Sequence, residues 1–130
     1  MGFQTTGTAS EFFAVDASKV TPIPAEMSFE EGAMIEPLAV AVHGVKQMGD
    51  VAGMNIAVIG AGPIGNLVAQ TAKGMGAAKV MITDVSTLRL EKAKECGVDV
   101  CVNTKDVDFG EAMLYAFGPD KADVIYDCAG

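Results

Sequence analysis

The feature that most constrains the fold is the segment from Asn55 to Gly65, which reads N-I-A-V-I-G-A-G-P-I-G. Its first half is a short apolar run rich in β-branched residues, which is typical of a strand buried on both faces of a sheet. Gly60, Gly62 and Gly65 follow at the spacing G-x-G-x-x-G. Pro63 suits the first position of a helix, and apolar residues recur at helical spacing after it. The segment therefore predicts a strand, a tight turn and a helix.

Each glycine has a separate role in a loop that binds a diphosphate. Gly60 lets the chain turn sharply as it leaves the strand. Gly62 has no Cβ, so a pyrophosphate can approach the backbone, and Gly65 lets the helix pack closely on the strand. The free N–H groups and the dipole at the start of the helix, near Pro63 and Ile64, favour a phosphate. The loop therefore predicts a nucleotide-binding site.

A second strand is expected from Lys79 to Thr83, and it ends at Asp84. An acid at this position accepts hydrogen bonds from the adenosine ribose hydroxyls and repels a 2′-phosphate, so the pattern predicts NAD rather than NADP. Two alternatives stay open. Sites for S-adenosylmethionine also place an acid at the end of the second strand. In some other α/β fold, the glycines would form only a turn and Asp84 would only cap the next helix.

Composition narrows the class of protein further. The 130 residues carry a net charge of −8, which gives no general attraction for nucleic acid or for an anionic membrane surface. Cys96, Cys101 and Cys128 form no C-x-x-C pair, so we expect buried thiols rather than disulfides or a structural zinc site. The sequence has no apolar run near the roughly 20 residues of a membrane span and no charged-then-apolar leader. We therefore expect a cytoplasmic protein.

The stretch before the central strand predicts a strand from Ala9 to Val15 and two helices. Ser28 and Glu31 form a capping box, which predicts a short helix that ends near Ile35. Pro37 is expected to interrupt it and to begin a second helix that runs to about Met48.

Strands and helices alternate from Asn55 onward. Further elements are expected as a helix capped by Ser86 and ending near Cys96, a strand at Val100 to Val102, a helix at Asp106 to Phe117 and a strand at Ala122 to Tyr126. This alternation predicts an α/β fold with right-handed crossovers, four parallel strands in the order 3-2-1-4 and helices on both faces.

The complete dinucleotide-binding fold has six strands, so this chain is expected to be a piece of a longer protein. The strand at Val124 would then be an unprotected edge, and we expect it to pair with another chain or segment.

Three segments together carry a resemblance to a known family. They are the run E-G-A-M-I-E-P-L-A-V from Glu31 to Val40, the glycine loop, and the run from Thr83 to Ser86 with Arg89 beyond it. They resemble the sorbitol dehydrogenase-like branch of the zinc-dependent medium-chain alcohol dehydrogenase family. Many families share the glycine loop, whereas the Glu36-Pro37-Leu38 motif upstream of it is more specific to polyol and threonine dehydrogenases. The resemblance extends from about residue 7 to residue 130.

The resemblance implies an oxidoreductase with a zinc-holding GroES-like catalytic domain and an NAD-binding Rossmann domain. Hydride would move between a secondary alcohol of a polyol, of the sorbitol or L-iditol type, and NAD. Residues 1–45 would be the tail of the catalytic domain, and residues 46–130 would be the first part of the Rossmann domain. Most zinc ligands would lie outside the chain, which we therefore expect to be inactive alone. The parent enzyme is expected to be a homo-oligomer.

The resemblance also assigns roles to single residues. Glu36 matches the glutamate at the catalytic zinc, as a ligand or through zinc-bound water and substrate. Ile64 matches a residue near the pyrophosphate, Asp84 the ribose acid, and Arg89 a residue over the adenosine end of NAD. The alternatives are that Glu36 is an ordinary acid before Pro37 and that Arg89 is a solvated helix residue.

Three functions are therefore compatible with the sequence. The first is the NAD-binding portion of a polyol dehydrogenase. The second keeps the enzyme class but changes the substrate to threonine, butanediol or another secondary alcohol. The third is a non-catalytic nucleotide-binding module.

Overall fold

The computed structural model describes residues 7–130, which fall into two compact units, one ending at Gly32 and the other running from Ala33 to Gly130. The first unit contains a 3₁₀-helix, η1 (Ala17–Lys19). The predicted strand from Ala9 to Val15 is wrong, because this segment forms bends and irregular backbone. Within the described residues no second strand lies beside it to complete a ladder, and an isolated strand is not stable in water.

Helix α1 (Phe29–Lys46) begins with the predicted capping box. The Glu31 N–H donates to Ser28 Oγ at 3.2 Å, and the Ser28 N–H donates to the Glu31 carboxylate at 2.8 Å. The predicted interruption at Pro37 is wrong, because α1 continues through it. A proline inside a helix removes one backbone hydrogen bond and crowds the preceding turn. That local cost is offset here by the capped start and by two fully buried residues near the other end, Ala41 and Val45.

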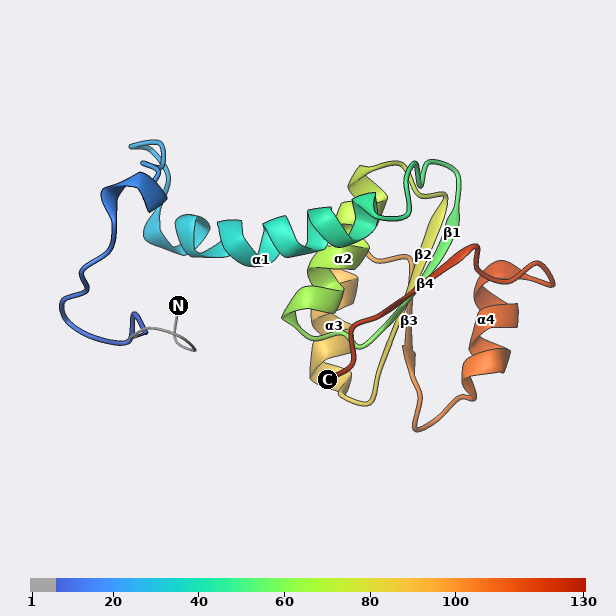
Figure 1. Ribbon diagram of the computed structural model, residues 1–130. Coiled ribbons are helices and arrows are strands. Elements are labelled where there is room, and N and C mark those ends of the chain that lie inside the picture. Colours follow the sequence, from blue (N-terminus) through green and yellow to red (C-terminus); the bar gives the residue numbers. More distant parts are fainter. Residues whose placement is uncertain (1–6) are drawn as a thin grey trace. The chain divides into compact units, whose positions relative to one another are not determined.

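The second unit is built on a four-stranded parallel sheet, which confirms the predicted order 3-2-1-4 (Figure 1). Its strands are β1 (Asn55–Ile59), β2 (Lys79–Asp84), β3 (Val100–Asn103) and β4 (Val124–Asp127). The register places Ile59 of β1 opposite Thr83 of β2 and opposite Asp127 of β4. The carboxyl ends of these strands therefore meet at one edge of the sheet, where parallel α/β sheets bind ligands.

Helices cover both faces of the sheet, as predicted. They are α2 (Pro63–Gly74), α3 (Thr87–Glu95) and α4 (Phe109–Phe117), and Figure 1 shows α4 on the opposite side of the strands from α2 and α3. Ile56 and Val58 pack with residues of α2 and α3, whereas Ala57 packs with α4. Adjacent residues of β1 thus point to opposite faces, and all three are fully buried.

Aspartates in two loops fix the starts of the strands. Asp99, before β3, accepts the Val80 N–H of β2 at 2.8 Å and forms an ion pair with Lys73 of α2. Asp123, before β4, accepts the Asn55 N–H of β1 at 2.7 Å. Burial raises the pKa of Asp99, but the bonds from Lys73 and Val80 outweigh it, so the pKa lies below the ordinary value. The charged form of Asp99 therefore stabilises the sheet.

No helix in residues 7–130 is long and apolar enough to cross a membrane. Strand β4 lies at one edge of the described sheet, as the sequence predicts. Its pairing with another chain stays a prediction, as does the domain division at residues 45 and 46.

Candidate functional site

Two of the loop glycines are required by the packing of the loop itself. Gly60 has φ +92°, and a Cβ on it would lie 2.9 Å from the backbone oxygen of Cys128. The Gly60 N–H donates to the Thr83 carbonyl at 2.7 Å, which joins the loop to β2. A Cβ on Gly65 would lie 1.8 Å from the Gly60 carbonyl oxygen. The glycine loop, residues 60–65, therefore holds β1, α2 and β4 in close contact.

Gly62 differs because the space beside it is open. No heavy atom of the described residues lies within 4 Å of a Cβ built on Gly62. Gly62 is the N-cap of α2 and Pro63 is the first helical residue, and in the described part of the chain no side chain caps this end. The N–H groups of Ile64 and Gly65 precede the first intrahelical bond, from Asn66 to Gly62. An uncapped helix start beside open space fits the phosphates of a dinucleotide.

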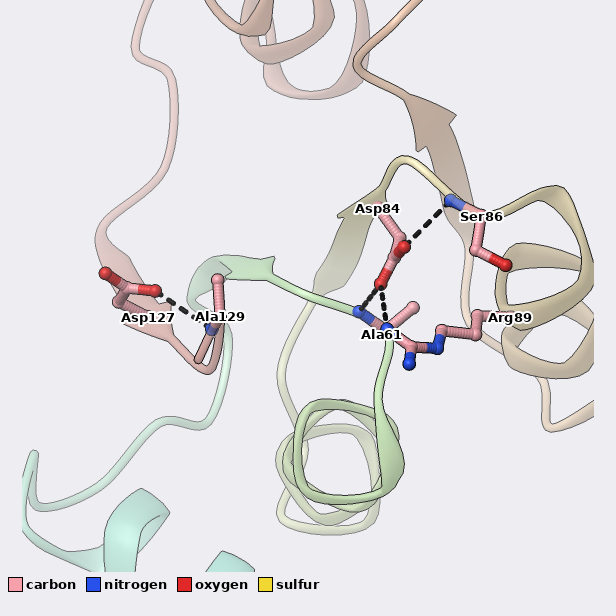
Figure 2. Close-up of polar contacts among 6 residues, drawn as sticks. All are labelled: Ala61, Asp84, Ser86, Arg89, Asp127 and Ala129. Atoms are coloured by element: carbon pink, nitrogen blue, oxygen red, sulfur yellow. Dashed lines mark hydrogen bonds and ion pairs between the residues drawn. The ribbon is translucent and has the colours of Figure 1, made fainter.

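Asp84 lies beside the glycine loop, as the sequence predicts (Figure 2). One carboxylate oxygen accepts the Ala61 N–H at 2.8 Å, and the other accepts the Ser86 N–H at 2.8 Å. The Arg89 guanidinium lies 3.7 Å from the oxygen that contacts Ala61. Burial raises the pKa of Asp84, but these hydrogen bonds and the Arg89 charge outweigh it and hold the pKa below its ordinary value. Asp84 is therefore a carboxylate at neutral pH although it is only 8 % exposed.

A cleft of about 420 Å³ opens between the ends of the strands. Gly60, Gly62, Asp84 and Arg89 line it. A second cleft of about 400 Å³ also borders the loop and is lined by Gly62, Pro63, Arg89 and others. Arg89 and Gly62 thus line both clefts, while Ile64 and Gly65 follow in the first turn of α2. The structure brings every predicted nucleotide-binding residue to this one edge of the sheet.

Sequence reasoning missed part of the cleft. Thr104 follows β3, Phe109 begins α4, and Ala129 follows β4, where its N–H donates to Asp127 Oδ1 at 3.1 Å (Figure 2). Their positions in the sequence could have identified them, because each residue comes soon after the carboxyl end of a parallel strand. Cys128, expected to be a buried thiol, is partly buried and lines the cleft. Burial, followed by the charge of Asp127, raises its pKa, so the thiol is protonated at neutral pH.

Glu36 lies apart from this cluster. It is exposed on α1 and does not line the cleft described above. No group of three or more His, Cys, Asp or Glu side chains in residues 7–130 is arranged to hold a metal ion. The described residues therefore do not fit a zinc site by themselves.

A hollow of about 490 Å³ lies elsewhere, beside β3 and α4. Cys101, Asn103 and Tyr115 are among its lining residues, and so is Glu111 in the first turn of α4. The N–H groups at this helix start are already taken, because Gly110 and Glu111 donate to Asp108. The hollow therefore lacks the features that bind a diphosphate.

Comparisons with known proteins agree with this geometry. The family model for "Zinc-binding dehydrogenase" matches residues 63–130. Sorbitol dehydrogenase of Pongo abelii is 46% identical over 126 residues, which are 95% of this chain and 35% of that protein. L-Idonate 5-dehydrogenase of Escherichia coli is 36% identical, with a TM-score of 0.78 over 89% of this chain and 33% of that one. The short chain alcohol dehydrogenase of Escherichia coli CFT073, solved with NADH, is 33% identical, with a TM-score of 0.76 over 89% and 34%. The chain thus spans about a third of the length of these relatives.

Proposed function

The chain belongs to the zinc-binding dehydrogenase family, and on that basis we propose that it is the NAD-binding portion of a polyol dehydrogenase. The observation that carries the proposal is the position of Asp84, whose carboxylate lies at the glycine loop beside an uncapped helix start. The similarity to an alcohol dehydrogenase solved with NADH supports a nicotinamide dinucleotide as the ligand.

The chain's own residues would bind and orient the dinucleotide. The N–H groups at the start of α2 would donate to the pyrophosphate, which Gly62 allows to approach. The remaining lone pairs of Asp84 would accept the ribose hydroxyls, and its charge would repel a 2′-phosphate. Arg89, more than half exposed, would lie over the adenosine and keep the site from being purely anionic. Bound NAD supplies the hydride acceptor of an alcohol oxidation.

The substrate class rests on relatives rather than on this cleft. Sorbitol dehydrogenase and L-idonate 5-dehydrogenase are named for polyhydroxylated substrates, which favours a polyol for the parent protein. A (2R,3R)-butanediol dehydrogenase from Bacillus subtilis is similar as well, at 35% identity, so another secondary alcohol is the second candidate.

Glu36 as a zinc-side glutamate remains a proposal based on the Glu-Pro-Leu motif. Any zinc site that includes Glu36 would need further ligands from outside the described residues. We therefore expect no dehydrogenase turnover from the chain alone, and zinc-dependent oxidation of sorbitol by the isolated chain would contradict this.

We also propose that the parent protein is a homo-oligomer and that it lies in the cytoplasm. Ile125 of the edge strand β4 is half-exposed, which supports pairing of this edge within a homo-oligomer or with further chain. Three free thiols among the described residues support a reducing compartment such as the cytoplasm.

Isothermal titration calorimetry tests the nucleotide assignment. We expect the chain to bind NAD roughly tenfold or more tightly than NADP, because Asp84 repels the additional phosphate. The variant Asp50→Ala serves as a control for the loss of one negative charge, since it removes one carboxylate at the turn before β1. Tighter binding of NADP or of S-adenosylmethionine by the unmodified chain would overturn the proposal.

A further inference from the structure

Both carboxylate oxygens of Asp84 accept hydrogen bonds from the protein itself before a nucleotide binds. Its two oxygens accept N–H groups from two different segments, Ala61 of the glycine loop and Ser86 before α3. The side chain is 6% exposed. An acid that only selected a ribose would need one accessible oxygen at the cleft and no bond to the loop. The geometry therefore indicates a second task for this carboxylate.

The backbone N–H of Ala61 depends on Asp84 as its acceptor. Ala61 is 4% exposed, so its N–H has little access to water. A buried N–H without an acceptor is costly, and a bond to a charged acceptor is stronger than one between neutral groups. Ala61 also directly precedes Gly62, so the direction of its peptide sets where the Gly62 backbone and the start of α2 point. Loss of the Asp84 carboxylate would free this peptide to turn.

We propose that Asp84 is a positioning residue for the phosphate-binding loop. Its carboxylate holds the Ala61 N–H and thereby keeps Gly62 and the first N–H groups of α2 aimed at the cleft. Asp84 thus has two roles, because the same carboxylate also contacts the ribose in the function proposed above. The positioning role is a property of the ligand-free protein, and only the nucleotide part of its test rests on the proposed function.

The two roles predict opposite results for a ligand that contains phosphate but no ribose. If Asp84 acts only through its charge and its ribose contacts, its removal should strengthen the binding of inorganic pyrophosphate, since a nearby negative charge is lost. If Asp84 positions the loop, its removal should weaken that binding. Asp84→Asn is the informative variant, because it keeps the side-chain shape but can no longer offer acceptors to both Ala61 and Ser86.

The first test uses the ligand-free chain and backbone amide NMR. As the pH falls, the amide signals of Ala61 and Ser86 should shift together, with a midpoint below the ordinary pKa of an aspartate. In Asp84→Asn, the exchange of the Ala61 amide with solvent should rise roughly tenfold or more. Asp50→Ala is the matched control, because it removes the same charge from a carboxylate that accepts the Ala52 N–H at 3.0 Å. An Ala61 signal that does not titrate in the unmodified chain would overturn the proposal without any variant.

The second test titrates pyrophosphate into the unmodified chain, Asp84→Asn and Asp50→Ala, following the amide signals of Gly62 and Gly65. We expect several-fold weaker binding in Asp84→Asn and unchanged or tighter binding in Asp50→Ala. Equal or tighter binding in Asp84→Asn would overturn the positioning role. If the unmodified chain binds neither pyrophosphate nor NAD, the proposed function fails, while the ligand-free titration still decides whether Asp84 holds the loop.

Discussion

Among single residues, the glycines of the loop separate into two that the fold requires and one, Gly62, that the fold does not require. Gly60 and Gly65 are in contact with neighbouring backbone and leave no room for a Cβ. Gly62 faces open space within the described residues, so the folded chain gives no packing reason for a glycine there. In the function proposed above, Gly62 instead allows a diphosphate to approach the backbone, so that the spacing G-x-G-x-x-G would combine two different physical demands.

This separation predicts opposite effects of two alanine substitutions. Gly65→Ala should lower the free energy of unfolding by about 2–4 kcal/mol, because its Cβ would meet the Gly60 carbonyl. Gly62→Ala should change stability by less than about 1 kcal/mol, since its φ of −66° suits alanine, yet it should weaken NAD binding. Urea unfolding and calorimetry measure the two quantities. Equal losses of stability would show that Gly62 also serves packing.

The order strand, glycines, helix, strand, acid predicted that the loop glycines, Pro63 and Asp84 lie close together, and the structure places them at one edge of the sheet. Their roles in nucleotide binding stay a prediction. The bond from Ala61 to Asp84 could not be predicted, because it joins residues 23 positions apart in the chain through the tertiary fold. For the same reason, sequence analysis treated helix capping and ribose binding by Asp84 as alternatives, whereas the carboxylate bonds Ser86 and also lies at the cleft.

At the scale of elements, helix starts differ in how they are capped. Asp108 at the start of α4 accepts the N–H groups of Gly110 and Glu111, at 2.8 and 3.2 Å. Ser86 occupies the equivalent position of α3, as predicted, but within the described residues its side chain makes no capping bond. Instead its backbone N–H is held by Asp84. Asp84 therefore fixes the start of α3 from the preceding strand.

The contrast predicts different costs for removing the two side chains. Asp108→Ala should destabilise the chain by about 1 kcal/mol, the usual cost of losing an N-cap. Ser86→Ala should stay within about 0.5 kcal/mol of the unmodified chain, because no side-chain bond is lost. Thermal or urea unfolding of the two variants checks this. A loss for Ser86→Ala as large as that for Asp108→Ala would mean that the Ser86 hydroxyl caps α3 after all.

The elements that sequence analysis predicted wrongly share a cause. The residues from Ala9 to Val15 were predicted to form a strand, but a strand forms only beside a partner, which a local pattern does not reveal. The break at Pro37 rested on the local cost of a proline, while the packing of Ala41 and Val45 and the cap at Ser28 support the helix from both ends. In contrast, β1 and α2 were predicted well because burial, turn and helix start all agree locally.

At the scale of the whole molecule, two partly buried carboxylates connect stability to pH. Asp84 and Asp99 both have lowered pKa values in the folded chain. A lowered folded pKa stabilises the fold above the unfolded value of about 3.9, and this contribution is lost as the pH falls through the lowered pKa. The free energy of unfolding should therefore decrease as the pH falls below about 4.

Asp99→Asn tests this dependence without changing the nucleotide cleft. The variant should be less stable than the unmodified chain at pH 7, because Lys73 and the Val80 N–H lose a charged partner. Its stability should also depend less on pH, so the two curves should converge in acid. Urea unfolding between about pH 2 and 7 measures both curves. Parallel curves would contradict the assignment of this acid sensitivity to Asp99.

We propose that this chain binds the diphosphate of a dinucleotide between the glycine loop and the start of α2. Amide NMR during a titration with NAD is the decisive measurement. We expect the largest shifts at Gly62, Ile64 and Gly65, with further shifts near Asp84 and Arg89. Shifts concentrated instead around Cys101 and Tyr115, in the hollow beside β3, would contradict it.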